Sequence, residues 1–286
     1  MDKQTIKLVE CPRDAMQGWK TFIPTEKKID YINLLLQVGF DVIDFGSFVS
    51  PKAIPQMADT KEVLKGLRLD NTTSQLLAIV ANVRGAEEAM TYDEISFLGF
   101  PFSVSETFQL RNTNASIDES FNRVLEMQNL CVKSGKQLVI YLSMGFGNPY
   151  GDPWSEEVVF GWADKMASSG IKIISLADTV GLAKPEQVFS MTKYLVEHLP
   201  AVEIGVHLHS TQSNRQAKLE AALQAGCYRF DGALKGVGGC PMAYDELVGN
   251  MDSAWMINYF ESRHLLKSFH TEALQKSLLM AEELFS

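Results

Sequence analysis

Two histidines separated by one residue, His207 and His209, are the strongest sign of chemistry in the sequence. They end residues 203–209, an apolar run with the composition of a β-strand. Residues two apart on a strand project from the same face, so both imidazoles can reach one ion. The pair alone is equally compatible with histidines that line a core and bond to their neighbours, so further ligands decide the matter.

Arg13 and Asp14 favour a metal site, because they lie just after residues 6–11, the first apolar run of the chain. In a closed barrel of parallel strands, a carboxylate at the end of the first strand can reach histidines on the seventh. Asn250 could add an amide oxygen, although its Gly-Asn dipeptide often marks only a turn. Two imidazoles with carboxylate and amide oxygens suit Mg²⁺ or Mn²⁺, and zinc is not excluded.

Cys240 is the cysteine with surroundings suited to chemistry, since it follows three glycines in residues 236–241. Such a loop can close over a site and deliver a thiol. Cys11, Cys131 and Cys227 instead fit the usual role of a free cysteine as a small buried hydrophobe.

Other polar residues follow further apolar runs and could line a site at the same end of a barrel. They are Asp44 and Ser47 after the second run, Asn82 after the third, and Asp178 and Thr179 after the sixth. Asp178 could equally cap the loop that follows it, and Asp44 could do no more than hold Arg13 by an ion pair.

The elements that must position these residues alternate between helix and strand. In four segments an amphipathic helix ends at a glycine and a β-rich run follows, a pattern in which glycine supplies a left-handed cap. Ser116 to Glu119 is a capping box that starts a helix, and Pro185 suits the first turn of another. The four segments are residues 34–44, 129–141, 166–178 and 223–231, and the other predicted strands are 6–11, 76–81, 94–99 and 203–209.

Eight strands alternating with helices predict the α/β class and a (β/α)8 TIM barrel. We expect one domain over residues 1–286, with the barrel at about 5–265 and a helical C-terminal extension at about 266–286. No GxGxxG or GxxxxGK[ST] motif follows a strand, which argues against the usual nucleotide-binding sites.

Composition excludes several other classes of function. The formal net charge of −9 argues against surfaces built to bind nucleic acid or anionic lipid. No window approaches the ~20 apolar residues of a membrane span, and the start lacks the apolar core of a signal peptide. The four cysteines form no CxxC pair, so we expect reduced thiols and a cytoplasmic protein.

These motifs resemble the 3-hydroxy-3-methylglutaryl-CoA lyase family, within the larger group of metal-dependent barrel lyases and condensing enzymes. The resemblance extends from about residue 6 to residue 251. The matching stretches are PRDAMQ (12–17), IPTEKKI (23–29), SFVSPKAIPQMADTKEVLKG (47–66), SLADTVG (175–181), VHLHST (206–211) and GVGGCP (236–241).

The resemblance implies cleavage of 3-hydroxy-3-methylglutaryl-CoA to acetyl-CoA and acetoacetate, in a homodimer or larger assembly. It implies a divalent ion held by Asp14, His207, His209 and Asn250. Arg13 would be an electrophilic catalyst, Asp14 or His207 the base, and Cys240 an acid/base thiol. The expected substrate contacts are Arg13, Gln17, Lys20, Asp44, Asp178 and Thr179.

Several residues depart from the family's pattern and predict a reshaped pocket floor and an altered surrounding of the metal. Ala15 stands where the family has glycine, Gly18 and Trp19 where it has Asn-Glu, and Asp44 where it has glutamate. Ser210 replaces an aspartate, and Ala177 replaces a glycine.

Two other functions fit some of the same residues. A Claisen-type condensing enzyme of the isopropylmalate synthase type would use the same metal and arginine, but the cysteine loop counts against it. A non-catalytic metal-binding barrel would have no use for a thiol such as Cys240 on its rim.

Overall fold

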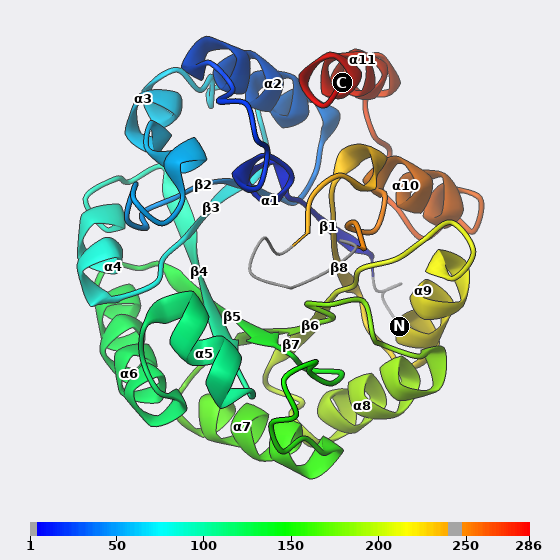
Figure 1. Cartoon of the computed structure of the whole chain (residues 1–286). Coiled ribbons are helices and arrows are strands. Elements are labelled where there is room, and N and C mark those ends of the chain that lie inside the picture. The colour runs from blue at the N-terminus through cyan, green and yellow to red at the C-terminus, as the bar shows by residue number, and fades with distance from the viewer. Residues whose placement is uncertain (1–4, 240–247) are drawn as a thin grey trace.

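The computed structural model describes residues 5–239 and 248–286, and within them eight parallel strands close into a barrel (Figure 1). Each strand pairs with the next along the chain, and β8 pairs with β1, which completes the ring. The predicted (β/α)8 class is therefore confirmed. The strands are β1 (Lys7–Glu10), β2 (Val42–Ser47), β3 (Gln75–Ile79), β4 (Ile95–Ser103), β5 (Gln137–Ser143), β6 (Ile173–Ala177), β7 (Glu203–His207) and β8 (Arg229–Gly232).

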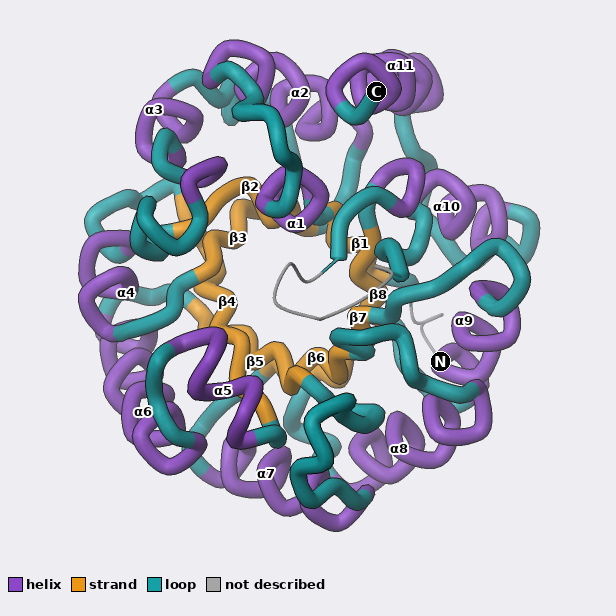
Figure 2. The backbone as a smooth tube through the Cα atoms, viewed as in Figure 1, coloured by secondary structure: helices purple, strands orange, loops and turns teal. Residues whose placement is uncertain are grey.

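The helices form a ring around the strands (Figure 2). As expected, Gly39, Gly135, Gly170 and Gly226 have positive φ just beyond four of them, where the chain turns back toward the barrel. The helices are α1 (Pro12–Gln17), α2 (Thr25–Val38), α3 (Thr60–Lys65), α4 (Val83–Ala89), α5 (Glu106–Thr113), α6 (Ile117–Lys133), α7 (Glu156–Ser168), α8 (Pro185–His198), α9 (Arg215–Gln224), α10 (Ser253–Glu261) and α11 (Thr271–Leu284), with short 3₁₀ turns η1 (Pro55–Met57) and η2 (Leu234–Gly236).

Two helix starts follow the local chemistry that the sequence indicates. Ser116 and Glu119 form a reciprocal capping box at the start of α6, and Pro185 opens α8. Both devices satisfy or remove backbone N–H groups that a helix start leaves without partners.

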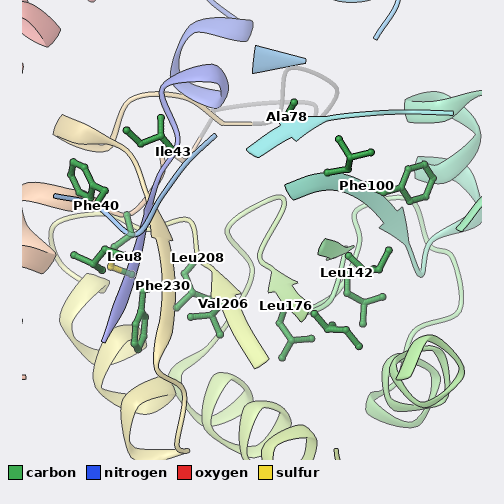
Figure 3. Close-up of a cluster of buried hydrophobic side chains, with 14 of the residues drawn as sticks. Leu8, Phe40, Ile43, Ala78, Phe100, Leu142, Leu176, Val206, Leu208 and Phe230 are labelled. Atoms are coloured by element: carbon green, nitrogen blue, oxygen red, sulfur yellow. The ribbon is translucent and has the colours of Figure 1, made fainter. Parts of the chain in front are cut away.

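Alternation along the strands divides the buried residues into two layers. One apolar layer lies between the strands and the helices, and Figure 3 shows part of it, including Leu8, Ile43 and Phe230. The residues between these positions face the barrel interior, where a smaller apolar cluster includes Val9 and Val42. The barrel thus has a packed interior and is open at the carboxyl ends of its strands.

The interior is polar on the side of β6, β7 and β8. The same alternation places Ser175, His207, Arg229 and Asp231 inside, and all but His207 are almost fully buried. Gly205 leaves space for Arg229, because a Cβ there would lie 2.9 Å from Cδ of the arginine.

Several strand ends differ from those predicted, among them that of β3, which ends at Ile79 and not at residue 81, and those of β4 and β7. β4 continues past Gly99 to Ser103, because residues 100–103 keep pairing with residues 140–143 of β5. β7 ends at His207, whereas we expected residue 209, because the chain leaves the ring there. His209 instead forms an antiparallel bridge with Asn250.

The last helix, α11, packs against α2 on the outside of the barrel (Figure 1). Phe285, just after α11, contacts the ring of Trp19 edge-on, with 5.4 Å between the ring centroids. None of the helices in the described parts of the chain is long and apolar enough to cross a membrane.

Candidate active site

Helix α1 follows β1 after a single residue and carries Arg13 and Asp14 into the open end of the barrel. Pro12 takes the first helical position, where its missing N–H is not needed. Gln17, about one turn on, donates from Nε2 to Oδ1 of Asp14 at 2.8 Å and accepts from Nη1 of Arg13 at 2.8 Å. Arg13 also donates to Oδ1 of Asp14 at 3.2 Å. These bonds fix the position of the carboxylate.

Asp14, His207 and His209 converge as the sequence predicts. Each offers one ligand atom, and these atoms all lie within 4.8 Å of one another. His207 comes from the end of β7, and His209 is buried just beyond it. The arrangement is a possible metal site of two imidazoles and one carboxylate.

Asn250 lies beside these three residues, and its hydrogen bonds show whether a cation would fit between them. Its Nδ2 donates to Oδ2 of Asp14 at 2.7 Å and to the carbonyl of Val237 at 2.9 Å. Its Oδ1 is buried and has no hydrogen-bond partner among the described residues. A buried amide oxygen without a donor is costly, and a divalent cation is a partner that such an oxygen takes.

The pKa values of Asp14, His207 and His209, the three candidate ligands, differ because their neighbours differ. Burial would lower the pKa of His207, but the carboxylate of Asp231, helped by Asp14, raises it above its ordinary value. Burial and the charge of His207 lower the pKa of His209 to about 3. Burial acts against ionised Asp14, but Arg13 and His207 hold its pKa below the usual range. A neutral His209 and an anionic Asp14 are the forms that bind a metal.

Arg13 is held by the carboxylate of Asp44. Its Nε lies 3.2 and 3.0 Å from the two carboxylate oxygens, and its Nη2 lies 2.5 Å from Oδ2. Both side chains are buried, and burial raises the pKa of Asp44 to about 6, although Arg13 acts in the opposite direction. The pair fixes a guanidinium beside the carboxylate of Asp14.

A cavity of about 620 Å³ opens above these groups. Of the predicted substrate contacts, Arg13, Gln17, Asp44 and Thr179 line it. Lys20 is exposed and Asp178 is buried, and neither is among the lining residues. Many of the other lining residues were not predicted as site residues, among them Arg111 on α5 and Tyr141 on β5. Arg111 neither follows a strand end nor belongs to a recognisable motif, whereas Tyr141 is the last residue of the predicted segment 129–141 and could have been found from that position.

Asp178 instead makes contacts that suit the loop-capping alternative. Its Oδ1 accepts from the backbone N–H of Ala183 at 2.9 Å, and its Oδ2 accepts from Nζ of Lys218 at 2.7 Å. Lys218, buried on α9, also donates to the carbonyl of His209 at 2.8 Å. Asp178 thus supports the backbone that carries a candidate ligand.

Asp231 is a contact of His207 that was not predicted from the sequence. Its Oδ2 lies 3.4 Å from Nδ1 of His207. A carboxylate close to the end of the eighth strand was the available signal, because residues 223–231 were already recognised as a strand segment.

Cys240 lies outside the described residues, but the residues just before it can be placed. A Cβ on Gly238 would lie 2.7 Å from Nδ2 of Asn250 and 2.9 Å from the carbonyl of Asp14. The loop thus starts against two candidate ligands. Cys11, Cys131 and Cys227 are buried as expected, and burial raises the pKa of Cys131 and of Cys227 to about 12.

Comparison with known sequences identifies one family. The HMGL-like family model matches residues 6–282. The mitochondrial hydroxymethylglutaryl-CoA lyase of Mus musculus is 36% identical over 259 residues, which cover 88% of this chain and 78% of that protein. Hydroxymethylglutaryl-CoA lyase YngG of Bacillus subtilis is 37% identical over 241 residues, covering 84% of this chain and 80% of that protein.

Solved structures agree. The HMG-CoA lyase of Acinetobacter baumannii, in complex with coenzyme A and 3-methylmalate, has a TM-score of 0.91 at 31% identity and covers 99% of this chain and 92% of that chain. The Bacillus subtilis HMG-CoA lyase has a TM-score of 0.90 at 32% identity, with 99% and 95% covered. The carboxyl transferase domain of Rhizobium etli pyruvate carboxylase, at 15% identity and a TM-score of 0.74, shares the fold.

Proposed function

Because this chain belongs to the HMGL-like family, we propose that it is a divalent-metal-dependent carbon–carbon lyase. Its substrate would be 3-hydroxy-3-methylglutaryl-CoA or a related 3-hydroxyacyl-CoA, cleaved to acetyl-CoA and a keto acid such as acetoacetate. The observation that carries the proposal is the convergence of Asp14, His207 and His209 beside the partnerless Oδ1 of Asn250.

Asp14, His207, His209 and Asn250 would hold the ion, and their oxygen and imidazole atoms suit Mg²⁺ or Mn²⁺. When bound, such an ion lowers the pKa of a substrate hydroxyl and orients it. Asp14 and His207 are the two groups that could take the hydroxyl proton.

Arg13 would stabilise the negative charge that collects on the thioester oxygen as the carbon–carbon bond breaks. Its guanidinium lines the cavity and is already oriented by Asp44 and Gln17. A charge fixed before the reaction need not reorganise during it, which is why such groups contribute strongly to catalysis. Cys240 would then protonate the enolate carbon, and the contact of Gly238 with Asn250 supports a thiol close to the site.

The test is an assay of the purified protein with Mg²⁺ or Mn²⁺ and 3-hydroxy-3-methylglutaryl-CoA, together with shorter and longer 3-hydroxyacyl-CoA substrates. We expect acetyl-CoA release that stops on chelation with EDTA and returns with added Mn²⁺. Cys240→Ser should lower kcat by ~10² to 10⁴-fold, the usual contribution of a positioned acid.

Cys131→Ser is the matched control, because this thiol is buried on α6, outside the strands. It should leave kcat unchanged. Turnover that survives Cys240→Ser at the wild-type rate would remove the thiol from the mechanism. Turnover in the presence of EDTA would remove the metal.

We also propose a cytoplasmic location and a homodimer or larger assembly. The relatives include forms named mitochondrial and forms named cytoplasmic, so fractionation of the source cells is the direct test of location. Light scattering of the purified protein would measure the number of subunits.

A further inference from the structure

Two charged side chains, Asp231 and Arg229, lie inside the barrel next to the strand that carries the candidate ligand His207. In the register of β7 and β8, His207 pairs with Asp231, and Gly205 pairs with Arg229. The remainder of the interior contains apolar residues such as Val9, Val42 and Leu77. Buried charges destabilise a fold unless they are paired, so this arrangement requires an explanation.

Asp231 is oriented toward His207 by its surroundings. The side chain is fully buried, and its Oδ2 lies 3.4 Å from Nδ1 of His207. The hydroxyl of Ser175 donates to the same oxygen at 3.4 Å. Nδ1 of His207 is buried and has no other partner among the described residues, so this carboxylate is the acceptor that lies beside it.

Arg229 supplies the positive charge that compensates this buried carboxylate. It lies two residues before Asp231 on the same face of β8, and its Nη1 donates to Oε1 of Glu203 at 3.1 Å. Its Nε and Nη2, and Oδ1 of Asp231, have no hydrogen-bond partner in the described part of the chain. The absence of a side chain at Gly205 makes room for the arginine.

We infer that Asp231 is a positioning residue that acts through His207, a role that rests on the proposed metal site. Its carboxylate accepts the Nδ1 hydrogen of the ring, so that the lone pair of Nε2 faces Asp14 and His209. A carboxylate behind a metal-binding imidazole fixes its tautomer and orientation and increases its basicity.

The first test is Mn²⁺ binding measured by calorimetry with the full chain. We expect Asp231→Asn to raise the Kd for Mn²⁺ by ~10 to 100-fold, the usual effect of losing such a partner. The matched control is Glu10→Gln, which changes a buried carboxylate of β1 whose Oε1 bonds the backbone N–H of Leu234. Glu10→Gln should bind Mn²⁺ as the wild type does.

The outcomes separate this role from the metal site itself. His209→Ala should abolish Mn²⁺ binding. If it does so while Asp231→Asn keeps the wild-type Kd, the role of Asp231 is overturned and the metal site stands. A wild-type protein that binds no Mn²⁺ overturns both.

A second measurement uses the wild-type protein, so it does not depend on whether an Asp231 variant folds. Long-range proton–nitrogen NMR correlations at pH 8 distinguish the two tautomers of each of the five histidines, with His207→Gln used to assign the signal. We expect the hydrogen of His207 on Nδ1. A hydrogen on Nε2 would contradict the inference.

Discussion

At the scale of single residues, the candidate ligands are held in place by groups that come from other strands and helices. Asp14 receives hydrogen bonds from Arg13, Gln17 and Asn250, and Asp44 holds Arg13 in turn. Ligands fixed in this way lose little freedom when an ion or substrate binds, which favours both affinity and catalysis. A change in any one supporting residue is therefore expected to affect function.

The raised pKa of Asp44 leads us to expect that activity decreases at acidic pH. Burial raises its pKa to about 6, so the carboxyl becomes neutral as the pH falls below about 6 and its grip on Arg13 weakens. We expect kcat/KM to fall about tenfold per pH unit there, as for one essential ionisation. In the Asp44→Asn variant, this fall of kcat/KM at acidic pH should be absent.

The effect on stability has the opposite sign. The folded-state pKa of Asp44 lies above its ordinary 3.8, so the stabilising contribution of this group is complete below about pH 4 and is lost as the pH rises through about 6. Thermal melts at the same pH values therefore separate the two effects. An acid limb that persists in Asp44→Asn would belong to another group.

At the scale of elements, residues 237–239, which follow η2, pack directly on two of the candidate ligands. Gly238 has φ +103° and lies against both Asp14 and Asn250. A side chain there would be strained by the backbone conformation and would also displace these two candidate ligands.

Gly238→Ala is therefore expected to weaken Mn²⁺ binding by ~10 to 100-fold and to lower the free energy of unfolding by about 1 kcal/mol. Gly135→Ala is the matched control, because its φ is +66° and nothing lies within 4 Å of an added Cβ. It should show a similar loss of stability in melts but normal Mn²⁺ affinity in calorimetry. Equal affinities in the two variants would contradict the proposed contact.

The sequence predicted the elements well because their signals are local. The capping box of Ser116 and the glycines after the helices act within a few residues. Arg13, Asp14 and the two histidines were found because they follow apolar runs. The pairing of Asp178 with Lys218 and of His207 with Asp231 joins residues from separate elements, and no local pattern encodes such contacts.

At the scale of the whole molecule, ring closure links the two ends of the barrel. β1 is held between β2 and β8, so the first and last strands cannot detach independently without opening the sheet. The single domain that we propose, with its helical extension near the C-terminus, follows from this closure and from the packing of α11 on α2.

We accordingly expect one cooperative unfolding transition in guanidinium chloride, with coincident loss of far-ultraviolet and near-ultraviolet circular dichroism. Mn²⁺ should shift the midpoint upward, because a ligand that binds only the folded state stabilises it. Two separate transitions would show that α11 or part of the barrel is an independent unit.

The edge-on contact of Phe285 with Trp19 connects the outside of the barrel to the cavity, because Trp19 also lines the cavity. The turn after α11 therefore supports, from outside the barrel, a residue of the cavity wall that substrate would touch. A fusion partner or affinity tag joined after Ser286 would push on this wall from outside, and the resulting loss of turnover would be mistaken for a defect in chemistry.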